Sequence, residues 1–469
     1  MSLFEPILQH PVVWSLFAVY LIGTSYLAWL GHKKTDDLSS FAIGKGDMHP
    51  VVVGVTLAAS VASTATFVIN PGFVYVHGLS AFLHFGAAAG TGIITGLLVL
   101  GLGFRQVGQQ TGALTLPQWI GERYESKAMT VFFSAVNLLS VMFIVLIVGG
   151  LSIVMQRTLG LSNTASLALI IGFVFSYIFI GGTYAHAFTN TLQGIFMAVI
   201  AAIVVGSGIH FFADGLAPVW STLAAQDPNL VKAVNPDSTL YGSNFSIWVA
   251  GLVIGFALVS QPHILIKTLY VEEEKEMWQS LGVAVVVTIV FTALLLVGFY
   301  AHLMEIPAEQ FVDPATGQFR QDLVMTVYVT EAFSPFMVAV ISVVLLAAGM
   351  STLDGILIAL SSIVANDLFL NLTKNNLLAD KTEEEQGEIA HRVGQGILVL
   401  LGLLTFAIAL NPPELLGIFG QVGVYGIVAA SCVPIAGGIF FPNVGKRTMF
   451  TAAIVGIGAH IGFYILGAW

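Results

Sequence analysis

Charged side chains are scarce in this sequence. Asp, Glu, Lys and Arg together make up 9% of its 469 residues, whereas they make up about 25% of an average soluble domain. Hydrophobic residues make up 57% of the chain, and so few charges could not cover the surface of a water-soluble protein of this size. The composition therefore excludes a soluble globular protein and indicates a membrane protein.

Other features that the sequence lacks narrow the class of membrane protein. Cys432 is the only cysteine, so no disulfide can form within the chain. The sequence has no cluster of basic residues that would indicate a nucleic-acid partner. Alternating strand patterns are absent too, whereas apolar runs near the ~20 residues of a spanning helix recur along the chain. We therefore expect an all-α polytopic protein of the lipid bilayer, without nucleic acid.

The apolar runs predict about twelve membrane spans. The first run lacks the basic flank of a signal peptide, so we expect it to be retained as a helix. The two longest connections, about 213–245 and 304–332, contain Pro, Asp, Asn and Gly and are expected outside the membrane. The predicted spans are 11–31, 51–76, 80–104, 128–156, 162–182, 188–212, 246–266, 278–303, 333–370, 393–411, 414–441 and 448–468.

The basic residues orient these spans. With the N-terminus outside, 13 of the 16 Lys and Arg residues face the cytoplasm, Lys267 among them, and Arg157, Lys232 and Arg320 remain outside. Cytoplasmic loops of membrane proteins carry an excess of Lys and Arg. We therefore expect a multi-pass protein of the cell membrane with its N-terminus outside, and an even number of spans returns the C-terminus to the outside.

One carboxylate lies deep in a predicted span. Asp354 stands within LLAAGMSTLDGILIALSSIV, and a charge at the centre of a spanning helix costs roughly 2.5–3.5 kcal/mol on insertion scales. On a helix, Ser351, Asp354 and Gly355 share one face with Thr352 beside it, and such oxygens are the ligands that a hard cation prefers. An intramembrane carboxylate indicates a functional site; the alternative is a packing aspartate bonded to a neighbouring hydroxyl.

The second span supplies a possible partner for this face. In TLAASVASTATFVINPGFVY (56–75), small residues are crowded before a helix break predicted at Asn70-Pro71-Gly72. Small residues let helices approach closely, which is the alternative to a binding role. A broken helix also frees backbone carbonyls, and these are tolerated at membrane depth only where they line a cavity or bind something.

These segments resemble the sodium/solute symporter family, which includes the bacterial sodium/proline, sodium/galactose and sodium/sialic acid symporters. The resemblance runs over nearly the whole chain. Its motifs are DLSSFAIGKGDMHP (37–50), LAASVASTATFVINPGFVY (57–75), TLPQWIGERY (115–124), GGTYAHAFTNTLQG (181–194), SQPH (260–263) and AAGMSTLDG (347–355).

The resemblance implies a LeuT-type fold. Residues 1–469 would form one transporter domain in which five helices, 51–212, repeat with inverted topology as 246–441. One extra helix, 11–31, precedes the repeats and one, 448–468, follows them. Inverted repeats with broken helices place the substrate near the middle of the membrane and permit alternating access.

The resemblance also implies a Na⁺ site. In this family the ion lies between core helices one and eight, which corresponds here to the carbonyls of Ala59, Ala62 and Ala348 and the hydroxyls of Ser351 and Thr352. Five neutral oxygens suit Na⁺ because they replace its hydration shell without the strong grip of several carboxylates. Na⁺ is thus the expected coupling ion.

A second cation or proton position is expected beside the first. Relatives with a second ion site usually have an aspartate in core helix five, where this chain has Asn190. Core helix eight here carries Asp354 where a hydroxyl would stand, so the charge has moved across the same space. We expect Asp354 and Asn190, with Ser351, to line this position.

The expected substrate cavity is poor in groups that bind sugars. The positions that match sugar contacts are aromatic or short, which disfavours a hexose and favours a small organic anion or amino acid. The expected substrate-binding residues are Thr66, Asn70, His84, Phe85, Phe256 and Gln421.

The leading hypothesis is secondary active transport, in which inward Na⁺ movement drives uptake of a small organic solute. One alternative is a proton-coupled symporter that uses Asp354. Another is a solute-sensing membrane module without its own output domain. The sequence has no nucleophile–base or metal-ligand pattern, so we do not expect an enzyme.

Overall fold

The computed structural model describes residues 10–33, 42, 48–312, 317–413 and 416–467. Most of the motif 37–50 therefore lies outside the described residues. Within them every regular element is a helix, and strand-like pairing is limited to isolated bridge residues such as the antiparallel pair Val312 and Phe319. The expectation of an all-α chain is confirmed for this part.

The first half of the chain folds into the helices that the apolar runs predict. Its elements are α2 (Pro11–His32), α4 (Pro50–Val61), η1 (Ala65–Ile69), α5 (Asn70–His77), α6 (Leu79–Phe82), η2 (Leu83–Ala89), α7 (Gly90–Thr111), α8 (Leu116–Arg123), α9 (Lys127–Asn137), α10 (Ser140–Leu159) and α11 (Asn163–Ser207).

The second half follows the same pattern, with short helices in both long connections. Its elements are η3 (Ile209–Phe212), α12 (Leu216–Gln226), η4 (Phe245–Val249), α13 (Ala250–Leu258), α14 (Pro262–Leu265), η5 (Ile266–Leu269), α15 (Glu274–Thr292), η6 (Ala293–Leu296), α16 (Val297–Leu303), η7 (Ala308–Phe311), η8 (Gln321–Leu323), α17 (Val324–Ala332), α18 (Pro335–Ser362), η9 (Ile363–Leu370), α19 (Asn371–Thr373), α20 (Glu383–Ala409), α21 (Leu416–Phe440) and α22 (Lys446–Ile465).

The described residues contain nine helices that are long and apolar enough to cross a membrane, or up to eleven if each of two bent pairs is one span. A shorter apolar helix, Asn163–Phe179, stands where the sequence predicts a span over 162–182. Together these segments correspond in order to the twelve predicted runs.

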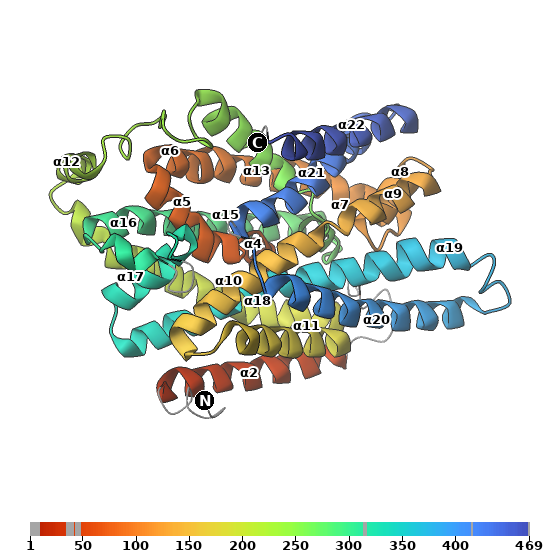
Figure 1. Ribbon diagram of the computed structural model, residues 1–469. Helices are drawn as coiled ribbons and strands as arrows, with labels where there is room; N and C mark the ends of the chain where they lie inside the picture. The colour runs from red at the N-terminus through yellow and green to blue at the C-terminus, as the bar shows by residue number, and fades with distance from the viewer. Residues whose placement is uncertain (1–9, 34–41, 43–47, 313–316, 414–415, 468–469) are drawn as a thin grey trace.

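The long helices run broadly in one direction, with different elements at the two ends of the bundle. In Figure 1, α12 and α17 lie at the left end, and α8, α9 and the connection from α19 to α20 lie at the right end. Helix α18 packs against α10 and α11, and α2 covers α11 from outside. Because 78% of the most apolar stretch of α18 is buried, against 11% in α22, α18 is a central helix and α22 a peripheral one.

The two spans predicted at 162–182 and 188–212 meet at Gly182. They correspond to two helical segments, Asn163–Phe179 and Gly182–Ser207, which together make up α11 and join through the non-helical backbone of Gly182. Gly182 has a φ of 54°, a conformation that costs glycine little because it has no Cβ. The chain therefore changes direction without the intervening loop.

The break predicted at Asn70-Pro71-Gly72 is wrong. The helix is interrupted earlier, at Ala62–Thr64, where α4 and the following helix meet at 55°. Pro71 lies inside the continuous helix Ala65–His77, directly after its π-helical turn η1. Local π-helical adjustment lets a spanning helix tolerate a proline, which has no N–H to donate. The helix therefore continues through the proline instead of ending there.

Candidate functional site

Two interrupted helices meet at the centre of the molecule. The pair Pro50–Val61 and Ala65–His77 is bent by 55°, and the pair Phe245–Leu258 and Pro262–Leu269 by 59°. They open the two halves predicted from sequence, and interrupted helices at matching positions of two halves point to a transporter's binding site. Residues from both breaks line one cavity, which is therefore the candidate site.

The first break releases a backbone carbonyl. Ala62 has φ −86° and ψ 84°, and the N–H of Ser63 donates to the Val61 carbonyl at 3.2 Å; this is an inverse γ-turn. In an unbroken helix that N–H would donate to Ala59, four residues earlier. The Ala59 carbonyl therefore has no donor from its own helix.

Two hydroxyls of α18 lie close to this carbonyl. Ser351 Oγ and Thr352 Oγ1 each lie 3.4 Å from the Ala59 carbonyl oxygen, and Ser351 Oγ donates to the Ala348 carbonyl at 2.8 Å. The structure thus brings together Ala59, Ala348, Ser351 and Thr352, all buried. The fifth predicted ligand, Ala62, lies at the break itself.

These oxygens fit a cation the size of Na⁺. A hard cation of similar size, Ca²⁺, is ligated by oxygens at about 2.4 Å, and two such ligands at right angles lie about 3.4 Å apart. The oxygens of Ser351 and Thr352 have this separation from that of Ala59. Their close approach also depends on Gly349, because a Cβ there would overlap Leu151 and Thr64.

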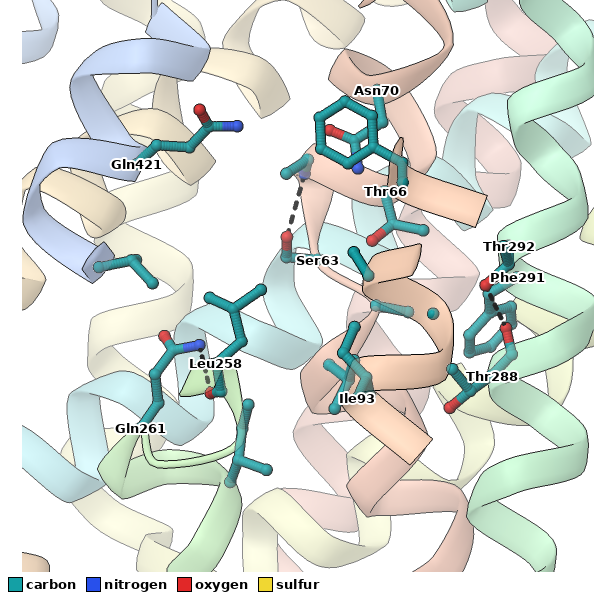
Figure 2. A pocket seen from close by; sticks show the side chains of 18 of the residues that line it. Ser63, Thr66, Asn70, Ile93, Leu258, Gln261, Thr288, Phe291, Thr292 and Gln421 are labelled. Atoms are coloured by element: carbon teal, nitrogen blue, oxygen red, sulfur yellow. Dashed lines mark hydrogen bonds between the residues drawn. The ribbon is translucent and has the colours of Figure 1, made fainter. Parts of the chain in front are cut away.

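The cavity beside this cluster has a volume of about 130 Å³. Figure 2 shows Gln421 and Gln261 on one side, Thr66 and Asn70 near the middle, and Thr288 and Thr292 on the other side. None of the described residues that line it carries a formal charge. The cavity thus offers amides and hydroxyls to a solute but no charged side chain.

Four of the six predicted substrate residues line this cavity: Thr66, Asn70, Phe85 and Gln421. His84 does not; its Nδ1 lies 2.8 Å from the Ser246 carbonyl oxygen, in the contact between η2 and η4.

His84 packs edge-on against the cavity residue Phe85, with ring centroids 4.9 Å apart, and both rings contact Tyr241. Phe256 is also outside the lining, on α13, where that helix packs against α7.

Sequence reasoning missed several lining residues. Ser63, Gln261, Thr288 and Thr292 line the cavity without having been predicted. Gln261 could have been found, because it directly precedes Pro262 at an interruption of an apolar run. Thr288 and Thr292 give no such signal, since single hydroxyls are common in spanning helices.

Asp354 is fully buried next to the ion-site residues. The Tyr177 hydroxyl donates to its Oδ1, while Oδ2 has no hydrogen-bond partner among the described residues and lies 3.9 Å from His186 Nδ1. Asn190 Nδ2 lies 3.2 Å from His186 Nε2 and donates to the Ser351 carbonyl at 3.4 Å. His186 therefore stands between Asp354 and Asn190, two residues that the sequence places together.

The position of Lys267 differs from the one predicted from sequence. The sequence places it in a cytoplasmic loop, whereas the structure buries it with 1% of its surface exposed, in η5. Its ammonium donates to the Ser60 hydroxyl and to the Thr56 carbonyl, the latter at 3.4 Å. A single lysine directly after an apolar run predicts the end of the run and a loop position, because periodicity alone does not show that the bundle buries the side chain.

Comparisons with known proteins agree with this geometry. The chain is 27% identical to the sodium/pantothenate symporter of Haemophilus influenzae, over 96% of this chain and 90% of that one. It is 24% identical to the sodium/proline symporter of Escherichia coli, over 84% of this chain and 76% of that one.

A solved structure shares the fold. A Na⁺-coupled sialic acid symporter in a substrate-bound outward-open state superimposes with a TM-score of 0.76 at 15% identity, over 96% of this chain and 95% of that one. The expected LeuT-type fold is thereby confirmed.

The model of the sodium:solute symporter family matches residues 41–456. That match covers most of the chain and agrees with the broken helices and the oxygen cluster. The chain therefore belongs to the sodium:solute symporter family and is a Na⁺-coupled solute transporter of the membrane.

Proposed function

We propose that this protein imports a small carboxylate or amino acid together with Na⁺, which binds at Ala59, Ala62, Ala348, Ser351 and Thr352. The observation that carries the proposal is the Ala59 carbonyl, released by the break in its helix and faced by two hydroxyls of α18. Bound Na⁺ would supply a positive charge beside the cavity. Its binding would also link α4 to α18, so the ion can favour one arrangement of these helices.

The size of the cavity supports a small solute. An engineered cavity of about 150 Å³ accommodates benzene, and the cavity here is about 130 Å³. Proline, the solute of one relative, is close to that size, whereas pantothenate, the solute of another, is considerably larger. The substrate we propose is therefore a short monocarboxylate or an amino acid of about the size of proline.

The electrostatic character of the cavity lining supports an anionic or zwitterionic solute. The described lining holds no carboxylate that could compensate a cationic solute. A solute carboxylate can instead face the positive ends of helices that begin at the breaks, near Ala65 and Pro262, and the bound Na⁺. Amides and hydroxyls such as Gln261, Gln421 and Thr66 would bind the remaining polar groups. His84 and Phe256, also predicted to bind the substrate, have no such support.

The second cation or proton position at Asp354 and Asn190 stays a prediction. The unpartnered Oδ2 of Asp354 supports it, and so does the approach of Asn190 to the carbonyl of Ser351. The intervening His186 does not favour a metal ion there, since its ring nitrogen lies 3.9 Å from the carboxylate.

We further propose that the protein lies in the cell membrane with both termini outside. The excess of Lys and Arg in predicted cytoplasmic loops supports an N-terminus and a C-terminus outside, and removing Lys267 from the count does not change the direction of that excess. The bent helices that open 51–212 and 246–441 support two inverted repeats. We propose transport alone, without an enzymatic reaction; the described residues that line the cavity include no pair of nucleophile and base.

Uptake into proteoliposomes tests the function. With an inward Na⁺ gradient, we expect accumulation of labelled proline or of a short monocarboxylate, and none when choline replaces Na⁺. Pantothenate and a hexose serve as a larger and a polyhydroxylated control. Na⁺-dependent accumulation of the hexose alone would contradict the proposal, and so would uptake that ignores Na⁺ and follows a proton gradient.

A further inference from the structure

The connection between α12 and η4 is hydrogen-bonded to the first broken helix. Residues 227–243, called the strap below, consist of turns and bends. The Leu79 N–H donates to the Leu230 carbonyl at 2.8 Å, and Asn235 Nδ2 donates to the His77 carbonyl at 3.3 Å. In Figure 1 the strap leaves α12 and passes close to α6. The strap is therefore held against the junction of α5 and α6.

One aromatic residue of the strap is buried. Tyr241 is 5% exposed, whereas residues 242–245, which follow it, are exposed. The N–H groups of Tyr241 and Leu240 donate to Ser238 Oγ at 2.9 and 3.3 Å, so a local turn fixes the backbone from which the ring points inward. Aromatic side chains bury a large apolar surface, and the insertion of one from an exposed connection requires partners inside the molecule.

The ring of Tyr241 packs against four other rings. The centroid distances fall in the range in which aromatic rings attract one another: 6.4 Å from Phe73, 5.2 Å from His77, 4.9 Å from His84 and 5.8 Å from Phe85. Phe73 and His84 are buried like Tyr241, and Phe85 lines the cavity proposed to bind the solute. The strap thus places Tyr241 directly behind one wall of that cavity.

We propose that Tyr241 is a lid residue, which closes the solute cavity toward the strap and positions Phe85 in the cavity wall. A solute that enters or leaves on this side has to separate Phe85 from the rings behind it. This inference rests on the proposed function, because it takes the cavity as the solute site. It adds a residue outside the cavity lining that controls access to the cavity.

The position of the ring links access to the first break. Phe73 and His77 belong to α5, in the helix that begins after this break, whereas His84 and Phe85 belong to η2. Tyr241 contacts both pairs. A change in the 55° bend at the break would therefore move one pair relative to the other, and Tyr241 would lose contacts on one side. The lid is thus closed only while α5 and η2 keep the arrangement seen here.

Labelling of a cysteine in the cavity wall tests the inference. Ala89 lines the cavity and Cys432 is the only native cysteine, so C432S/A89C carries one reporter thiol. Its rate of reaction with a charged, water-soluble methanethiosulfonate is measured on the full-length protein in nanodiscs with Na⁺. Adding Y241A should raise this rate at least about tenfold, which corresponds to about 1.4 kcal/mol in the opening of the lid. Adding Y241F, which keeps the ring, should leave the rate within about twofold of the parent.

Two controls separate opening of the lid from a general loosening of the fold. F245A removes an exposed ring shortly after the strap and should react at the parent rate. A reporter at S134C replaces a fully buried side chain of α9, at the end of the bundle opposite α12, and Y241A should not change its labelling. An unchanged rate at A89C in Y241A would overturn the inference, and so would an equal rise at both reporters.

If Y241A does not yield monodisperse protein, S238A replaces it. This variant removes the hydroxyl that accepts the Tyr241 N–H and should raise the rate at A89C, whereas T239A, at the exposed neighbouring residue, should not. An unchanged rate in S238A would then overturn the inference. Proline or a short monocarboxylate should slow the labelling of A89C in the parent. If no such solute does so while Y241A reacts faster, the proposed solute site is wrong and the lid is supported.

Discussion

The two broken helices differ in how their backbone groups are hydrogen-bonded at the break. At the first break, the Ser63 N–H turns to Val61 and the Ala59 carbonyl loses its helical donor. At the second break, the N–H groups of Ser260 and Gln261 donate to carbonyls three residues earlier, at 2.8 and 3.3 Å. The second break is thus a tight turn that keeps its backbone bonded, and Pro262 restarts the helix.

This difference gives the two breaks different roles in the site. The first break exposes backbone and is flanked by alanine, serine and threonine, which leave room for α18 to approach. The second break exposes side chains: Gln261 reaches the cavity and Lys267 enters the bundle on the following turn. We infer that the first break binds the ion, while the second contributes to solute recognition.

The largest effect is expected from removing the hydroxyls that face the first break. In S351A/T352A two ligands of Na⁺ are lost, and a loss of only 1.4 kcal/mol in binding raises the Na⁺ concentration for half-maximal uptake about tenfold. We expect at least that change, with folding preserved because alanine favours helix. Uptake measured against Na⁺ concentration in proteoliposomes checks it.

The matched control for this pair is S342A/S361A, which removes two other buried hydroxyls from α18. It should keep the Na⁺ dependence of the wild type. Equal Na⁺ dependence of S351A/T352A and the wild type would show that the hydroxyls do not bind the ion.

A smaller effect is expected from adding one methyl group at the contact between α18 and the first break. In G349A the new Cβ meets Leu151 and Thr64, and overpacking of this kind costs about 1–3 kcal/mol. We expect a lower melting temperature and weaker Na⁺ binding, measured by thermal unfolding at several Na⁺ concentrations. G396A, on α20 with open space around its Cα, is the control and should do neither; an unchanged Na⁺ response of G349A would separate this contact from the site.

A substitution at the second break should change solute binding and leave Na⁺ binding as in the wild type. In Q261A the cavity loses an amide that can bind the solute, and one hydrogen bond of about 0.5–1.5 kcal/mol corresponds to a rise in KM of about two- to tenfold. The Na⁺ dependence should stay as in the wild type, because Gln261 does not contact the oxygen cluster. Kinetics of solute uptake at saturating Na⁺ check this, and a shift in Na⁺ dependence without a change in KM would reverse the assignment.

The sequence predicted more of the fold than of the cavity. Apolar runs located the spans because a spanning helix needs about 20 apolar residues wherever it lies. The oxygen cluster was predicted through the family motif around Ser351 and Thr352.

The break at Ala62 was not predicted, because proline was taken as the interruption and a γ-turn has no such marker residue. Lys267 and Tyr177 were missed for a related reason: periodicity shows which face of a helix is apolar, but only the packing of several helices shows which partner a buried polar side chain finds.

The smallest effect is expected at a residue that the sequence assigned to the substrate and the structure does not. In H84L the contact with the Ser246 carbonyl is lost, which costs about 0.5–1.5 kcal/mol of stability for one hydrogen bond. Leucine fills similar volume on η2, and the ring faces η4, so the cavity keeps its shape. We expect a modestly lower melting temperature and a KM within about twofold of the wild type, which is under 0.5 kcal/mol of binding. A tenfold rise in KM at unchanged stability would return His84 to the binding site, and would mean that η2 turns toward the cavity during transport.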